Sequence, residues 1–245
     1  VHINRLLSGE VRLGDYHILA IPGGFTYGDD IISGRILANE LRLRLGAEIQ
    51  AFIAAGRLII GICNGFQVLV RSGILPGRLS GDTPWAPEDR QQVSLTYNDS
   101  GRFEARWTHL EVCGRSVWTE GLPERLYLPV AHAEGKFVPL DNATLRALQD
   151  NQQVAFRYCA AGGGDPVYPA DPNGSVDHIA GITDRTGRIL GLMPHPERHF
   201  VGIQHPHWTR AGQVPDHGDG ARIFENGVRY VRDRVVRHAL MEGYA

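Results

Sequence analysis

The chain has 245 residues, of which 42% are hydrophobic and 21% charged, so it can bury a substantial core, and we expect a single domain over residues 1–245. The formal net charge is −2 and no run is rich in Lys and Arg, which argues against a nucleic-acid partner. No apolar run approaches the ~20 residues that cross a bilayer, and the first ten residues lack the apolar core of a signal peptide, so we expect no membrane partner.

Two short apolar runs in the first third of the chain predict strands. Residues 16–21 and 57–63 are apolar without alternation, which is typical of parallel strands buried on both faces. The stretch 34–55 between them has helical spacing, and residues 64–72 continue as a helix directly after the second run. The order strand, helix, strand, helix favours an α/β protein with a mostly parallel, doubly wound sheet and flanking helices.

From residue 91 to 190 the pattern changes to shorter, alternating segments broken by Gly and Pro, which predicts an antiparallel extension of the sheet. Residues 160–175 are rich in Gly, Pro and Asp and predict a long turn between two strands. The segments 178–184 and 188–197 follow as a predicted hairpin. Residues 220–240 have apolar positions at helical spacing and predict an amphipathic helix.

The segment LIIGICNGFQVL carries the clearest chemical signal. An apolar strand runs into Gly-Ile-Cys-Asn-Gly and then into a helix, which is the pattern of a nucleophile elbow with Cys63 in place of Ser. Gly61 and Gly65 remove side chains that would collide with neighbouring elements. The positive end of the helix favours the thiolate form of Cys63. The alternative, a small buried cysteine at a strand end, does not account for the whole pattern.

The other two cysteines, Cys113 and Cys159, lie far from Cys63 in the sequence. An odd number of widely spaced cysteines argues against a disulfide framework and against a CxxC zinc site. We therefore expect a cytoplasmic protein.

His195 is the predicted general base, since it ends an apolar strand in GLMPHPERHF, where α/β enzymes assemble their sites. In an extended segment Glu197 lies on the same side as His195, so its carboxylate can orient the imidazole. A rival hypothesis makes a metal site of the string His195, His199, His205, His207 and His217. This spacing matches no compact tetrahedral set, so we expect no metal and place the later histidines on the surface or in loops.

The turn Ile-Pro-Gly-Gly-Phe at 21–25 follows the first predicted strand, and its glycines leave backbone N–H groups free to face a ligand. Acyl transfer needs two donors for the developing oxyanion. The backbone N–H groups of Gly24 and of Asn64, the residue after the nucleophile, are the expected pair.

Taken together, five blocks resemble the class I glutamine amidotransferases and, within them, the glutaminase subunits of phosphoribosylformylglycinamidine synthases of purine biosynthesis. The blocks appear in the same order over nearly the whole chain: PGGFTYGDD, GICNGFQVL, AHAEGKF, DPNGSVDHIAGI and GLMPHPER. The resemblance implies the flavodoxin-like fold of that family, hydrolysis of glutamine through Cys63, His195 and Glu197, and transfer of the ammonia to a synthetase.

The resemblance also implies that Gly23, Gly65 and Gln67 bind the substrate glutamine. It implies no cofactor in this chain, with ATP and magnesium bound by the synthetase, and it admits a small accessory subunit. His132, Glu134 and Gly135 fall outside the expected triad, and a hairpin loop with incidental charge explains them as well as a role in the site does. Arg102 and Phe103 fit the family pattern, although pairing within a strand explains them nearly as well.

Three departures from the family pattern stand out. The chain starts without Met, and the first strand of the family, normally central in the sheet, is not recognisable before Val1. The segment GDDIISGRILA replaces a more usual Gly-Asp-Tyr-Leu arrangement, and residues 199–219 form a longer tail without an assigned role. The alternatives are an amidotransferase for another synthetase, such as one for CTP or GMP, a cysteine peptidase of similar fold, or a non-catalytic interaction module.

Overall fold

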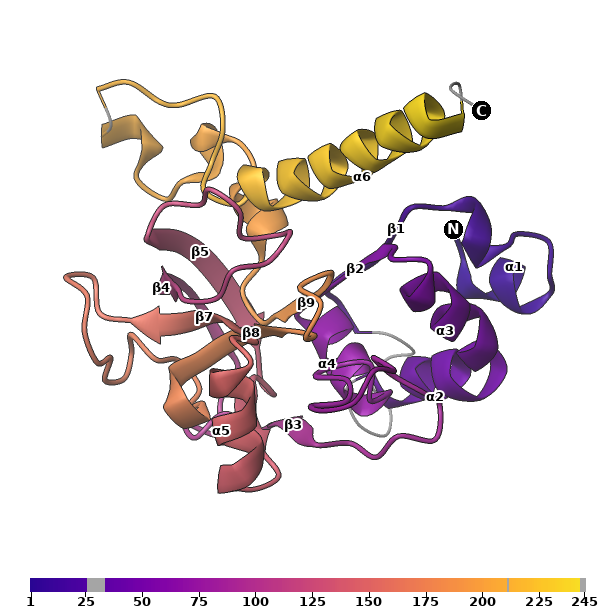
Figure 1. Cartoon of the computed structure of the whole chain (residues 1–245). Helices are drawn as coiled ribbons and strands as arrows, with labels where there is room; N and C mark the ends of the chain where they lie inside the picture. Colours follow the sequence, from indigo (N-terminus) through magenta and orange to yellow (C-terminus); the bar gives the residue numbers. More distant parts are fainter. Residues whose placement is uncertain (26–33, 211, 243–245) are drawn as a thin grey trace.

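The computed structural model describes residues 1–25, 34–210 and 212–242, with side chains up to residue 234 in the last helix (Figure 1). Its main feature is a seven-stranded mixed sheet with the order β1-β2-β9-β8-β7-β4-β5. The strands in this spatial order are Ile18–Ile21, Leu58–Ile62, Ile189–Leu192, Ile179–Thr183, Val154–Cys159, Glu104–Val112 and Arg125–His132. A second sheet pairs β3 (Val93–Thr96) with β6 (Lys136–Pro139).

The predicted α/β class, with parallel strands and an antiparallel extension, is confirmed. Strands β1, β2 and β9 are parallel, whereas all pairs from β9 through β8, β7 and β4 to β5 are antiparallel. The antiparallel part therefore contributes more pairs than expected for a mostly parallel sheet. Every residue of β8 and β9 is buried, so their apolar runs carry no alternation that reveals the direction of pairing.

Helices flank the sheet and cover its parallel part (Figure 1). The longer ones are α2 (Arg35–Arg44), α3 (Gly46–Ala54), α4 (Asn64–Arg71), α5 (Asn142–Asp150) and α6 (Ala221–Glu242). Short ones are α1 (Ile3–Leu7), η1 (Leu13–Asp15), η3 (Val176–His178), η4 (Pro196–His199), η5 (Gly202–Gln204) and η6 (Trp208–Arg210). Within the described residues, no helix is both long and apolar enough to cross a membrane.

The helical pattern over 34–55 is divided between two helices, which the periodicity did not reveal. Leu45 leaves helical geometry, with φ −115° and ψ 9°, and its side chain is buried in the core. At Gly46, which begins α3, a Cβ atom would lie only 2.8 Å from the Pro87 ring. The predicted helical stretch thus consists of two helices that meet at the buried Leu45. Helix α5 was not expected; its N-cap is Asp141, whose side chain accepts a hydrogen bond from Thr144 N.

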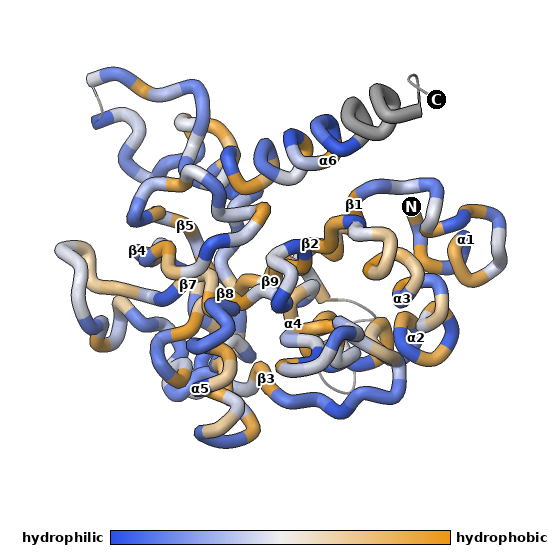
Figure 2. The backbone as a smooth tube through the Cα atoms, in the orientation of Figure 1, coloured by the Kyte–Doolittle hydropathy of each residue, from blue (hydrophilic) through white to orange (hydrophobic). Residues whose placement is uncertain are grey.

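Apolar residues follow the strands of the parallel part, whereas α6 carries many hydrophilic ones (Figure 2). All five residues of β2 are buried, and α4 packs directly on this strand. Two glycines permit this approach. A Cβ on Gly61 would lie 2.6 Å from Gly65 O, and one on Gly65 would collide with the carbonyl oxygen of Ile21. The predicted steric role of both glycines is confirmed.

Replacing Gly65 by Ala is expected to lower the free energy of unfolding by about 1–3 kcal/mol or more, because the new methyl group meets backbone atoms of β1 that no rotamer change can move. Urea unfolding of the purified chain measures this. Gly162→Ala is the matched control, since open space surrounds Gly162. Equal stability of the two variants would contradict the proposed packing of α4 against β1.

Candidate active site

Cys63 lies at the corner between β2 and α4, as the elbow pattern predicts. Its backbone has φ 52° and ψ −107°, a conformation that costs a non-glycine residue of order 1–3 kcal/mol. The turn is held by a hydrogen bond from Cys63 N to Leu192 O of β9, at 2.8 Å. Such strain at a strand-to-helix corner is what exposes the nucleophile of an elbow to its substrate.

His195 and Glu197 are in contact, as predicted. His195 Nδ1 lies 2.6 Å from Glu197 Oε1, and the His195 side chain is almost fully buried, whereas that of Glu197 is 43% exposed. The pair is not made along an extended segment, however. Pro196 begins the helical turn η4 directly after His195, and this turn brings the carboxylate back to the ring. The carboxylate accepts from Nδ1, which leaves Nε2 to exchange protons with a substrate.

Gly23 shows that Cys63 and His195 border the same space. A Cβ atom on Gly23 would lie 2.8 Å from His195 Cε1 and 3.3 Å from Cys63 Cβ. His195 Nε2 is buried and has no hydrogen-bond partner in the described part of the chain. The predicted nucleophile and the predicted base are thus brought together by segments that lie 132 residues apart in the sequence, and the small size of Gly23 keeps the space between them open.

Strand β5 holds this arrangement from the far edge of the sheet. Its carbonyl groups at Tyr127, Pro129 and Ala131 point away from β4. The Tyr127 oxygen lies 2.9 Å from His199 Nδ1, and the Pro129 oxygen lies 2.8 Å from His195 N. The Ala131 oxygen lies 3.6 Å from Cys63 Sγ. The last strand of the sheet therefore contacts both halves of the site.

The predicted oxyanion donors remain predictions. Gly24 has φ 128°, which favours glycine, and no atom lies within 4 Å of the position of a Cβ there. The side chain of Asn64 donates a hydrogen bond to Gln67 Oε1 at 3.0 Å, so its own role is structural, while its backbone N–H is the group assigned to the oxyanion. Residues 28–33 of the divergent segment GDDIISGRILA lie outside the described residues.

Gln67, a predicted glutamine-binding residue, is engaged within the protein. Its Nε2 donates to Glu134 O at 2.6 Å, and its Oε1 accepts from Asn64. Glu134 in turn lies 3.6 Å from Arg71, one turn further along α4. Gln67 thereby ties the elbow helix to the loop after β5, and its contact with substrate remains a prediction, as do those of Gly23 and Gly65.

The block 132–135, which begins at the last residue of β5, lies nearer the site than the sequence indicated. His132 is buried, and a Cβ on Gly135 would collide with its ring. Burial, together with the charge of nearby His195, lowers the pKa of His132 to about 4. Asn98, which sequence reasoning missed, contacts the His132 ring with its amide oxygen at 3.1 Å. The His-Ala-Glu-Gly block was the one available signal for this part of the site.

The expected surface position of His199 is wrong. This residue is buried, and its ring packs edge-on against Trp107 with centroids 5.1 Å apart. The apolar face of Trp107 and the carbonyl of Tyr127 together explain its burial. His207 and His217 are exposed, as expected. Among the residues described, no group of three or more metal-ligating side chains converges.

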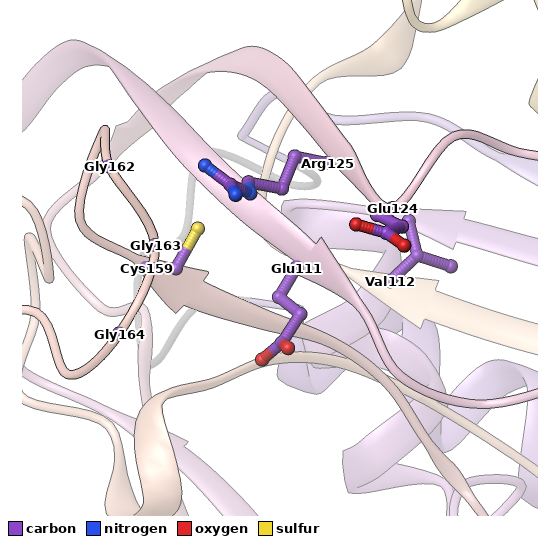
Figure 3. A pocket seen from close by; sticks show the side chains of 8 residues that line it. All are labelled: Glu111, Val112, Glu124, Arg125, Cys159, Gly162, Gly163 and Gly164. Atoms are coloured by element: carbon purple, nitrogen blue, oxygen red, sulfur yellow. The ribbon is translucent and has the colours of Figure 1, made fainter.

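Arg102 and Phe103 do not enter the site through their side chains, since both are exposed. The Arg102 carbonyl accepts a hydrogen bond from Asn98 Nδ2. A separate cavity of about 570 Å³ lies at the opposite end of β5 from Ala131. Figure 3 shows the side chains that line it, among them Glu111, Arg125 and Cys159; burial raises the pKa of the Cys159 thiol, so it is a poor nucleophile.

Comparisons with known proteins agree with this geometry. The sequence model of the CobB/CobQ-like glutamine amidotransferase domain matches residues 1–231. The phosphoribosylformylglycinamidine synthase subunit PurQ of Dehalococcoides mccartyi is 49% identical over 95% of this chain and 86% of that protein. Its counterpart in Methanococcus maripaludis is 40% identical over 94% of this chain and 86% of that protein.

A solved structure shows the same fold. The structure of PurLQS from Thermotoga maritima superposes with a TM-score of 0.66 at 29% identity, covering 91% of this chain and 83% of that one. The family match spans most of the sequence and contains the elbow and the His195–Glu197 pair. The chain therefore belongs to the CobB/CobQ-like glutamine amidotransferases and is related within them to the PurQ subunits of phosphoribosylformylglycinamidine synthase.

Proposed function

We propose that this chain is the glutaminase component of a phosphoribosylformylglycinamidine synthase and that it releases ammonia from glutamine for an ATP-dependent synthetase. The names of the PurQ relatives support the pathway. The observation that carries the chemistry is the convergence of Cys63 and His195 on the space beside Gly23.

The mechanism follows from the residues at this space. The Cys63 thiolate attacks the side-chain carboxamide of glutamine, and the backbone N–H groups of Gly24 and Asn64 stabilise the oxyanion. His195 Nε2 gives a proton to the departing nitrogen, so that ammonia and a glutamyl thioester form. Water, deprotonated by His195, then attacks the thioester and releases glutamate and the Cys63 thiol. Glu197 stabilises the imidazolium that His195 forms when it has taken the proton of Cys63, and again when it has taken a proton from water.

ATP and magnesium belong to the synthetase in this proposal, because the sequence contains no GxxxxGK[ST] phosphate-binding loop. The structure of PurLQS from Thermotoga maritima, which shares the fold, supports an assembly of this kind. A small accessory subunit is proposed on the family resemblance alone. The absence of disulfides from Cys63, Cys113 and Cys159 supports a cytoplasmic location.

The isolated chain is expected to hydrolyse glutamine slowly, and its synthetase is expected to raise the rate severalfold or more. Ammonia released without an acceptor wastes glutamine, so an oxyanion hole completed only on docking is favourable. Gly24 can supply such a switch, because glycine rotates its peptide at little steric cost. The loss of one oxyanion donor costs ~10²–10³ in rate, which suffices for control.

Glutamate production by the chain alone and with purified synthetase plus nucleotide tests this prediction and the proposed function together. Circular dichroism and a cooperative melt of the isolated chain must accompany the assay, because a poorly folded chain is also inactive. A folded chain that is inactive even with its synthetase refutes the function. A lone chain that already turns over at the rate of the complex refutes the switch while leaving the function in place.

A further inference from the structure

Asn98 is buried beside the loop that follows β5, and three hydrogen bonds fix the orientation of its amide. Asn98 Nδ2 donates to the carbonyl oxygens of Arg102 and His132, both at 2.9 Å. On the other side, Asn98 Oδ1 accepts from Gly135 N at 3.0 Å. If the amide were rotated by 180°, its oxygen would face the two carbonyl oxygens and its NH₂ group would face the Gly135 N–H. The positions of Oδ1 and Nδ2 are therefore unambiguous.

This orientation fixes the proton on His132. His132 Nδ1 lies 3.1 Å from Asn98 Oδ1, and an amide oxygen only accepts hydrogen bonds, so Nδ1 must carry the hydrogen. Because burial lowers the pKa of His132 to about 4, the ring is neutral near pH 7. A neutral ring with hydrogen on Nδ1 presents a lone pair at Nε2.

No hydrogen-bond donor in the described part of the chain reaches the lone pair of His132 Nε2. His132 is 3% exposed, and its Nε2 is buried without a hydrogen-bond partner among the described residues. An unsatisfied buried acceptor is rare in a folded protein and points to a ligand. His132 directly follows Ala131, whose carbonyl contacts Cys63 Sγ, and it lies close enough to His195 for the charge of His195 to oppose protonation of His132.

The charged groups around His132 come from η4, β4, α4 and the loop that follows β5. His195, at the start of η4, opposes protonation of His132, whereas Glu104, its neighbour on β4, favours it. Glu104 is itself bound by Arg106 and by Ser100. Glu134, in the loop that follows His132, is paired with Arg71 of α4. None of these groups donates a hydrogen bond to Nε2.

We propose that Asn98 is a positioning residue that holds His132 in the neutral Nδ1–H form, so that Nε2 accepts a hydrogen bond from the carboxamide nitrogen of the substrate as it becomes ammonia. The proposal rests on the proposed glutaminase function. The leaving nitrogen keeps its own hydrogens while it receives one proton from His195, so an acceptor on its other side orients it. A protonated His132 would instead turn an N–H group toward the hydrogens of the same nitrogen and could not accept from it.

The substitution Asn98→Asp tests this positioning role of Asn98. A carboxylate keeps the acceptor for His132 Nδ1–H but adds a negative charge, which raises the pKa of His132 and removes the lone pair from Nε2. In the complex with synthetase, glutaminase activity is expected to fall severalfold or more on the acid side, at about pH 5, and to change little at pH 7, because a pKa raised by about one or two units from about 4 still leaves the His132 ring neutral at pH 7. It should recover as the pH rises, with the acidic limb of the kcat/KM profile displaced upward by about one pH unit or more.

Asn226→Asp is the matched control, because Asn226 is equally buried and its Nδ2 also donates to two backbone carbonyls, those of Trp118 and Glu120. A control that keeps the wild-type pH profile supports the proposal. If Asn98→Asp also keeps that profile and merely loses folded protein, Asn98 is only structural and the proposal is wrong.

Nitrogen-15 NMR of the histidine rings in the wild-type chain gives an answer that needs no activity. A neutral His132 with hydrogen on Nδ1 between about pH 6 and 8 is expected. Hydrogen on Nε2, or a cationic ring, overturns the proposal even if Asn98→Asp fails to fold. An inactive wild-type complex would instead refute the proposed function, and the NMR result would still decide the state of His132.

Discussion

Replacing Cys63 by Ala is expected to abolish glutamine-dependent synthesis in the assembled complex while sparing synthesis from added ammonium salts. The sulfur is needed only to release ammonia, since the synthetase uses ammonia from either source. The substitution removes only the sulfur atom, and alanine is strained by the positive φ at this position no more than cysteine is. The fold should therefore tolerate it. Both activities are measured in one assay with either nitrogen source.

Cys113→Ala is the matched control, because Cys113 is exposed and lies outside the site. This variant should retain both activities. Parallel loss of both activities in Cys63→Ala would show that Cys63 is structural or that the two reactions are not separable, and it would remove the thiolate from the mechanism.

His195→Ala is expected to lower the glutaminase rate by ~10²-fold or more, since a general acid–base group serves both the formation and the hydrolysis of the thioester. Glu197→Gln should cost less. The amide oxygen of Gln can still accept from His195 Nδ1, so the ring keeps its orientation and loses only the charge that stabilises the imidazolium. Single-turnover kinetics of the complex separate the two steps.

His207→Ala serves as the control for this pair, because His207 belongs to the same part of the chain and is exposed. Its rate should match that of the wild type. Small and equal effects of His195→Ala and Glu197→Gln would exclude both residues from the triad.

The local parts of this site could be predicted from the sequence. The elbow depends on a strand, a glycine on each side of Cys63 and a helix that all lie within about twelve residues, so the pattern itself contains the geometry. The contact of Glu197 with His195 was also predicted, although the turn η4 rather than an extended segment produces it. A spacing of two residues is compatible with both conformations, and proline at position 196 fits both.

The long-range parts could not be predicted. Asn98 and His132 are 34 residues apart, and nothing in the local pattern of either residue shows that one amide orients the other ring. The burial of His199 depends on Trp107 of β4, a strand whose partners were unknown. The antiparallel pairing of β8 with β9 could be predicted, because the two segments form the predicted hairpin. The other antiparallel pairs could not, because they join segments that lie far apart in the sequence.

The contact between β5 and the segment 195–199 has a consequence for solubility. An edge strand with open carbonyls is a template on which another chain can add a strand, and proteins usually cover such edges. Here the cover is the segment that also holds the proton donor, through Pro129 and Tyr127. Substitutions that detach the segment 195–199 from β5 would expose the edge of this strand as well as displace His195. Aggregation would therefore limit the sequence of this segment even in a chain whose catalytic activity is not needed.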